Sequence, residues 1–167
     1  MNGSYNFLLH LIAFGIVAGT LIPNIILDRK LRSEPDWGRK LYIGGIMRSF
    51  GKFSPFTIGL LIITGLGNMY NRFADAPYPW YEETWLVVKL ACFLVIVFNV
   101  VFIVPKLGMR RATLIKSVVD KSAPADVDQQ MERYNRRISI LFTVQTVLLL
   151  SILVLSAFGT GKHPGQF

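Results

Sequence analysis

Four blocks of apolar residues, each about as long as a bilayer is thick, constrain this chain more than any other feature of its sequence. They cover roughly residues 7–27, 53–70, 84–104 and 138–158. About 20 consecutive apolar residues match the roughly 30 Å hydrocarbon core of a membrane, so each block is long enough to cross it once as a helix. The sequence therefore predicts an all-α integral membrane protein, with the whole chain forming one membrane domain built as a four-helix bundle.

The net charge of +8 is carried almost wholly by the segments between the apolar blocks. Segments 28–52 and 105–137 contain seven and eight Lys and Arg residues, whereas segment 71–83 contains one. Because basic residues stay on the cytoplasmic side of a membrane, this distribution predicts two basic cytoplasmic loops and both termini outside, in the cell inner (cytoplasmic) membrane. The same distribution favours the lipid bilayer as partner and argues against a nucleic acid.

The connections and breaks between the spans can be predicted in more detail. Segment 28–52 is expected to be a polar loop containing an amphipathic piece, whereas 105–137 reads as helical extensions of the third and fourth spans, broken near Ala123–Pro124. Pro105 is expected to close the third span. Gly15 and Gly19 lie four residues apart, a spacing that allows another helix to approach closely.

Two ionisable residues, His10 and Lys89, lie inside predicted spans. Such residues are costly in a membrane and are functional candidates by default. Both spans start from outside, so at about 1.5 Å per residue both side chains fall in the outer half of the bilayer, where Thr64 and Asn68 of the second span also lie. Two ordinary explanations stay open: the lysine can extend to the headgroups, and the histidine can hydrogen-bond a neighbouring helix.

A third explanation for these residues is functional: their chemistry indicates a haem site. Neutral imidazole is a common ligand of haem iron, and cofactors in helix bundles sit between facing helices. We therefore predict haem b as cofactor, with His10 as metal ligand and with Lys89 and Asn68 contributing to cofactor binding. Lys89 would serve as a second ligand or as the partner of a propionate or anionic substrate. Only one span contains a histidine, which excludes a haem held by histidines of two spans.

Several short motifs resemble the HemJ-type protoporphyrinogen oxidase family and the related CopD-like membrane domains. They are LLHLIAF around His10, the following AGTLIPNIIL, Arg48 with FSPFTIGLLIITGLG, and TWLVVKLACFL around Lys89. The order and spacing agree over nearly the whole chain, although Asn24 stands where that family has Arg and Ser54 where it has Asn. The resemblance implies a haem-associated role for His10 and catalytic roles for Lys89 and Arg48. It also implies oxidation of a tetrapyrrole precursor, with electrons passed through haem b to quinone.

Other functions remain open at the level of sequence, including whether the protein is an enzyme. The small size, the aromatic connection 71–83 and the amphipathic segment 105–137 also fit a non-catalytic accessory subunit of a larger respiratory, photosynthetic or transport complex, or a homo-oligomer. Copper handling, which the CopD-like resemblance suggests, is less favoured because the methionines form no spaced cluster and Cys92 is the only cysteine.

Overall fold

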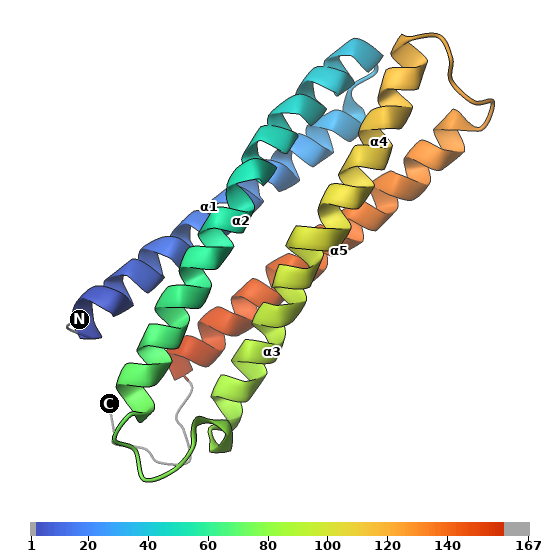
Figure 1. Cartoon of the computed structure of the whole chain (residues 1–167). Helices are drawn as coiled ribbons and strands as arrows, with labels where there is room; N and C mark the ends of the chain where they lie inside the picture. Colours follow the sequence, from blue (N-terminus) through green and yellow to red (C-terminus); the bar gives the residue numbers. More distant parts are fainter. Residues whose placement is uncertain (1–2, 159–167) are drawn as a thin grey trace.

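The structure, a computed structural model, describes residues 3–158, and that part of the chain is helical without a strand. The helices are α1 (Gly3–Ser33), α2 (Trp37–Phe73), α3 (Thr84–Phe98), α4 (Val104–Val119) and α5 (Val127–Phe158), with a 3₁₀ turn η1 (Trp80–Glu82) and a π-helical turn η2 (Asn99–Ile103). Because α3, η2 and α4 follow one another without a break, they form one rod (Figure 1). Four helical rods are thus long and apolar enough to cross a membrane. The predicted all-α architecture with four possible spans is confirmed.

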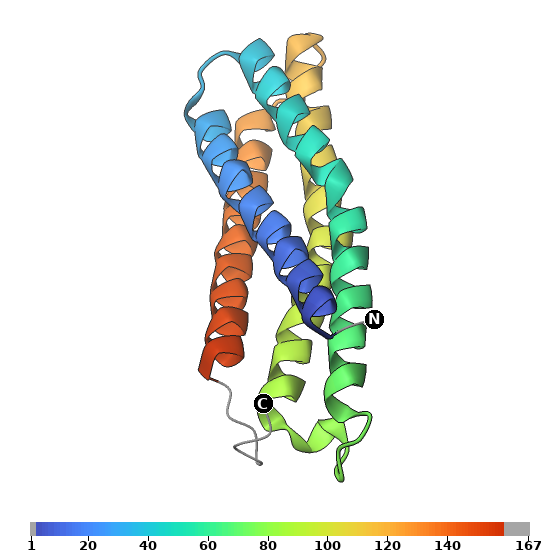
Figure 2. The same cartoon turned by 90° about the vertical axis from the view of Figure 1, so that its left-hand side faces the viewer.

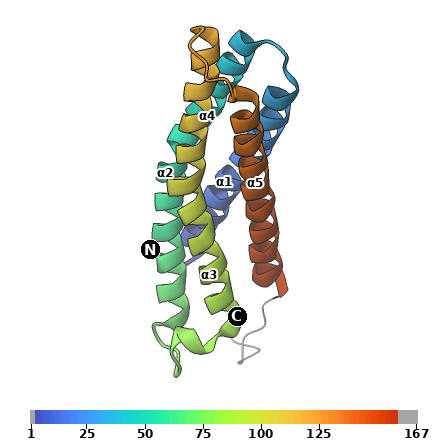
Figure 3. The ribbon, with the colours of Figure 1, turned by 90° about the vertical axis from the view of Figure 1, so that its right-hand side faces the viewer.

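The four rods pack as an antiparallel bundle because each is joined to the next by a short connection. Helix α1 packs against α2, and α3 packs against α5. Figure 2 shows α1 crossing obliquely between α2 and α5, and Figure 3 shows α5 beside α3 and α4. Residues 3 and 158 lie at one end of the bundle together with the connection 74–83, and we call this the terminal end. The turns 34–36 and 120–126 lie at the opposite end, which we call the basic end.

The helices are considerably longer than the apolar blocks. Helix α2 alone has 37 residues, about 55 Å at 1.5 Å per residue, against roughly 30 Å for the hydrocarbon core. The prediction of a loop over 28–52 was therefore wrong in extent, since only 34–36 lies outside a helix. By contrast, α4 and α5 do extend through most of 105–137, and the break at 120–126 includes Ala123 and Pro124. The basic residues are thus carried largely on helices.

Local chemistry accounts for the tight turn between α1 and α2. Pro35 disfavours helical backbone at the residue before it. Asp36 follows in an extended conformation, and its side chain accepts a hydrogen bond from the Arg39 backbone N–H at 2.7 Å. An aspartate in this position satisfies one of the unpaired N–H groups at a helix start, so α2 begins directly after the turn.

The helix continues through Pro105 into α4, as predicted for a helical extension of the third span. A proline inside a helix removes one hydrogen bond and crowds the carbonyl four residues earlier. Here that carbonyl belongs to Val101, which lies within the wider π-helical turn η2. The Val104 N–H bonds to the Asn99 carbonyl, five residues back, which is the π-helical spacing. The wider turn therefore lets the rod continue through the proline into α4.

The basic end and the middle of the bundle differ in where their apolar side chains lie. The basic end has an apolar core contributed by all four rods, formed by Leu31, Ile43, Leu114, Ile115 and Met131. Along the membrane-length part, large apolar side chains face outward, among them Phe56 and Ile63 of α2, which are 74% and 70% exposed. An apolar surface of this extent requires a non-aqueous environment, as expected for helices that contact lipid.

Candidate functional site

A cavity of about 1000 Å³ lies between α1, α2, α3 and α5 in the terminal half of the bundle. It has a polar region formed by side chains from three of these helices: His10 from α1, Asn68 and Arg72 from α2, and Trp85 and Lys89 from α3. The remaining lining is mainly apolar and includes Leu61, Phe93, Ile96, Leu149 and Ile152. The structure thus brings together three of the residues singled out from the sequence, His10, Asn68 and Lys89. Arg48 does not line the cavity; it is exposed and lies nearer the basic end.

The imidazole of His10 is held by a hydrogen bond to a neighbouring helix. Its Nδ1 lies 2.9 Å from Oγ1 of Thr64 on α2. The single hydroxyl proton of Thr64 points to the Leu60 carbonyl, 2.8 Å away. With the hydroxyl proton on the Leu60 carbonyl, the Thr64 oxygen can accept a hydrogen bond from Nδ1–H of His10, and this tautomer leaves a lone pair on Nε2. A fixed ring with one unprotonated nitrogen at a cavity wall is the arrangement of a metal-ligating histidine.

Two glycines of α2 make the close approach of α1 possible. A Cβ atom at Gly65 would lie 3.3 Å from Cε1 of His10, and a Cβ atom at Gly67 would lie 2.8 Å from Nδ2 of Asn6. By contrast, a Cβ atom at Gly15 or Gly19 would meet nothing within 4 Å. The prediction that Gly15 and Gly19 mark a close helix contact was therefore wrong within this chain, and the close contact lies on α2 instead.

Asn6 extends the polar contact between α1 and α2 by one helical turn. It is 7% exposed, and its Nδ2 donates to the Thr64 carbonyl at 2.9 Å and to Oδ1 of Asn68 at 2.6 Å. Asn68 thus contributes to the cavity wall while its amide oxygen is held by α1. Sequence reasoning missed Asn6 because it lies just before the predicted first span, where a polar residue is unremarkable. The nearest signal was the Gly-Asn pair at 67–68, which indicates where a side chain can approach.

Lys89 lines the cavity from α3, across from the α1–α2 contact. Its Nζ lies 6.0 Å from the centre of the Trp85 ring, and the Arg72 guanidinium lies 5.1 Å from the same ring. Within residues 3–158, Lys89 has neither a hydrogen bond nor an ion pair. The cavity thus combines the Lys89 side chain near the terminal end with an apolar interior, so it suits a lipophilic ligand that carries an anionic group.

The cavity reaches the apolar outer surface between α2 and α3. Of its lining residues, Leu66 on α2 is 58% exposed and Leu94 on α3 is 66% exposed. Both face the surface that these helices present to their surroundings.

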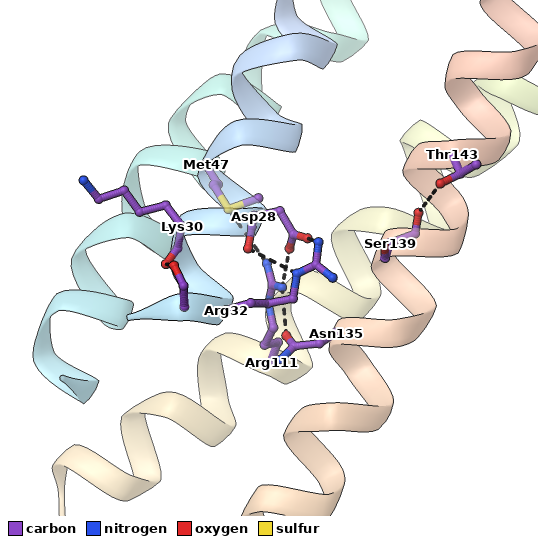
Figure 4. A network of polar contacts seen from close by, with 9 residues as sticks. Asp28, Lys30, Arg32, Met47, Arg111, Asn135, Ser139 and Thr143 are labelled. Carbon is purple, nitrogen blue, oxygen red and sulfur yellow. Dashed lines mark hydrogen bonds and ion pairs between the residues drawn. The ribbon is translucent and has the colours of Figure 1, made fainter. Parts of the chain in front are cut away.

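A second polar cluster lies toward the basic end, far from the cavity (Figure 4). Arg111 of α4 donates from Nη1 to Oδ1 of Asp28 on α1 and, at 3.2 Å, to Oδ1 of Asn135 on α5. Arg32 approaches the other carboxylate oxygen of Asp28 at 3.0 Å. Asp28 is 0% and Arg111 is 4% exposed. The cluster joins α1 to α4 by a buried ion pair and joins α5 to them through the amide of Asn135, and we interpret it as structural.

Among residues 3–158, no group of three or more His, Cys, Asp or Glu side chains is arranged to hold a metal ion. A metal bound in the cavity would thus need most of its ligands from a non-protein group. Comparison of the chain with protein-family models, with characterised proteins and with solved structures found no match. The interpretation of the site therefore rests on its geometry.

Proposed function

We propose that this protein is a membrane redox protein that binds haem b in the cavity, with Nε2 of His10 as an axial ligand. The observation that carries the proposal is the hydrogen bond between Nδ1 of His10 and Thr64, which holds the ring and, when Nδ1 is the donor, leaves Nε2 free to bind iron. A second-shell bond of this kind orients the ring of a ligating histidine and raises its basicity.

The remaining features of the cavity support a tetrapyrrole more than a bare metal ion. A tetrapyrrole supplies four of its own metal ligands, so one histidine is sufficient protein ligation. The volume of about 1000 Å³ is at the upper end for small-molecule sites, which suits a large planar ligand. Lys89 stands on the side of the cavity nearer the terminal end, where its ammonium can pair with a carboxylate. Copper handling has no comparable support.

The proposed chemistry is electron transfer between lipophilic partners in the membrane: a tetrapyrrole precursor would be oxidised, and its electrons would be passed on to a quinone, which is reduced. Bound haem would supply the one-electron carrier. The exposure of the lining residues Leu66 and Leu94 on the outer apolar surface supports entry of such partners from the bilayer. Lys89 would hold an anionic partner. Arg48, a catalytic candidate by resemblance, is not part of this proposed site because it does not line the cavity.

The proposed orientation places the basic end in the cytoplasm and the terminal end outside, in the inner membrane. It is supported by the fifteen Lys and Arg residues in segments 28–52 and 105–137 against one in 71–83. In this orientation the cavity lies in the outer half of the bilayer.

The absorption spectrum of the purified protein tests the haem proposal. We expect a Soret band that is lost in His10→Ala and retained in His163→Ala, which removes the other histidine of the chain. His163 lies outside the described residues, so no structural role is assigned to it. A colourless wild-type protein that is folded and supplied with haem during expression would refute the proposal. If such a protein also retained a partner at fixed stoichiometry, the accessory-subunit interpretation would replace it.

A further inference from the structure

Six exposed basic residues form a band around the bundle below the basic end. We call the following residues of α2, α4 and α5 the basic collar: Arg48, Lys52, Lys106, Arg110, Arg136 and Arg137. Arg133 of α5 and Arg29 of α1 are exposed at similar depth and add to the positive charge of this layer. None of the six has an ion pair or a side-chain hydrogen bond within residues 3–158. Their charges are therefore available to a partner outside the chain.

The collar lies at one depth along the bundle axis. Counted from the terminal end of each helix at about 1.5 Å per residue, Lys52 and Arg137 lie roughly 31 Å away, Lys106 roughly 33 Å, Arg48 roughly 37 Å and Arg110 roughly 39 Å. The hydrocarbon core of a bilayer is about 30 Å thick. If the apolar part of the bundle starts at one membrane surface, the collar lies just beyond the other, in the headgroup layer.

Acidic residues are separated from the collar along the same axis. Asp36, Asp120, Asp126 and Asp128 are exposed near the tip of the basic end, and Asp28 is buried and paired with Arg111. Glu132 is the one exposed acid among residues 3–158 close to the collar. The exposed charged side chains at the depth of the headgroup layer are thus nearly all basic, whereas those at the tip include both acidic and basic residues.

A small groove leads from the collar toward the tip. It has a volume of about 320 Å³, lies between α4 and α5, and is lined by Arg110, Thr113, Ser117, Gln130 and Tyr134. Arg110 thus belongs to both the collar and the groove. A guanidinium beside hydroxyl and amide groups is suited to a phosphodiester with a polar headgroup.

We propose that the basic collar is a binding surface for anionic phospholipids, with the phosphate on the collar cations and the polar headgroup in the α4–α5 groove. The positive charge, the depth and the absence of internal ion pairs all point to this partner. Clusters of four to eight Lys and Arg residues next to a membrane span attract anionic lipids in this way. The surface is separate from the haem cavity and does not depend on it.

Lipid enrichment measures this binding directly. The whole protein is reconstituted in equimolar phosphatidylglycerol and phosphatidylcholine, extracted in a neutral detergent, and the retained lipids are quantified by mass spectrometry. We expect the wild type to retain phosphatidylglycerol preferentially. The double variant Arg48→Gln/Lys52→Gln should lower this preference by about five-fold for each cation removed. Added salt should lower it in the wild type, whereas inorganic phosphate at the same ionic strength should have no further effect.

The matched control lies on the same helix. Arg39→Gln/Lys40→Gln also removes one Arg and one Lys from α2 but at the tip, roughly 50 Å from the terminal end, and should leave the preference unchanged. Lys106→Gln/Arg110→Gln removes the same charge from α4 and should repeat the loss if the first variant does not fold. Equal retention of the two lipids by the wild type, or equal losses from collar and tip variants, would overturn the proposal.

Discussion

Replacing Arg111 by methionine tests how the basic end of the bundle is held together. The substitution keeps much of the aliphatic bulk of the side chain but removes the guanidinium that joins Asp28 and Asn135. The Asp28 carboxylate stays 0% exposed in its surroundings and retains only Arg32 as a charged partner.

The structure sets different magnitudes for the two arginines. Removing one partner of a buried ion pair costs about 3–5 kcal/mol because the other charge stays buried, and we expect a loss of this size for Arg111→Met. The side chain of Arg32 is 33% exposed, and partly solvated pairs contribute about 1 kcal/mol or less. Arg32→Met should therefore have a much smaller effect.

A double-mutant cycle separates the pair from the rest of the packing. Asp28→Leu combined with Arg111→Met removes both buried charges, and an apolar replacement of a buried pair is often near neutral. The double variant should therefore be more stable than either single variant, with a coupling energy of about 3 kcal/mol. The assay is the free energy of unfolding in detergent micelles, followed by circular dichroism during titration with a denaturing detergent. Additive losses, or equal losses for Arg32→Met and Arg111→Met, would show that the buried pair does not hold this end.

Three further results are expected. Gly67→Ala should destabilise the protein by about 1–3 kcal/mol, because the new Cβ would lie 2.8 Å from Nδ2 of the buried Asn6 on α1. Gly51→Ala, whose Cβ would meet nothing within 4 Å, should be neutral or stabilising in the same unfolding assay. Thr64→Val removes the acceptor of the His10 ring N–H, and haem titration should show roughly 10–100-fold weaker binding; unchanged affinity would exclude the proposed orienting role. A reporter active only outside the cytoplasm should be silent when fused after Glu34, and activity there would reverse the proposed orientation.

The membrane-spanning helices could be predicted from the sequence because their signal is local. A run of about 20 apolar residues indicates a span whatever it packs against. The extension of the helices beyond the apolar blocks into segment 28–52 was not predicted, because it is not marked by a run of apolar residues. In segment 28–52 the charges masked a helical spacing, and the segment was interpreted as a loop. The spacing of Leu107, Arg111, Leu114 and Ile115, all buried on α4, shows the same type of signal in 105–137.

The candidate site could be predicted only in part, since depth is readable from sequence but helix rotation is not. Depth indicated that His10, Asn68 and Lys89 share one layer, and the structure brings them to one cavity. The hydrogen bond from His10 to Thr64 depends on how α1 is rotated against α2, and no spacing within either span determines that. The same limit applies to Asp28 and Arg111, which are 83 residues apart.

The two ends of the bundle differ in how freely they can respond to a ligand. At the basic end, an apolar core from all four rods and the paired charges of Asp28 and Arg111 fix the helices to one another. At the terminal end, the polar contacts of Asn6 and His10 tie α1 to α2, whereas α3 packs against α5 and the cavity separates α2 from α3. A ligand that enters between α2 and α3 therefore does not have to break the contacts that orient His10.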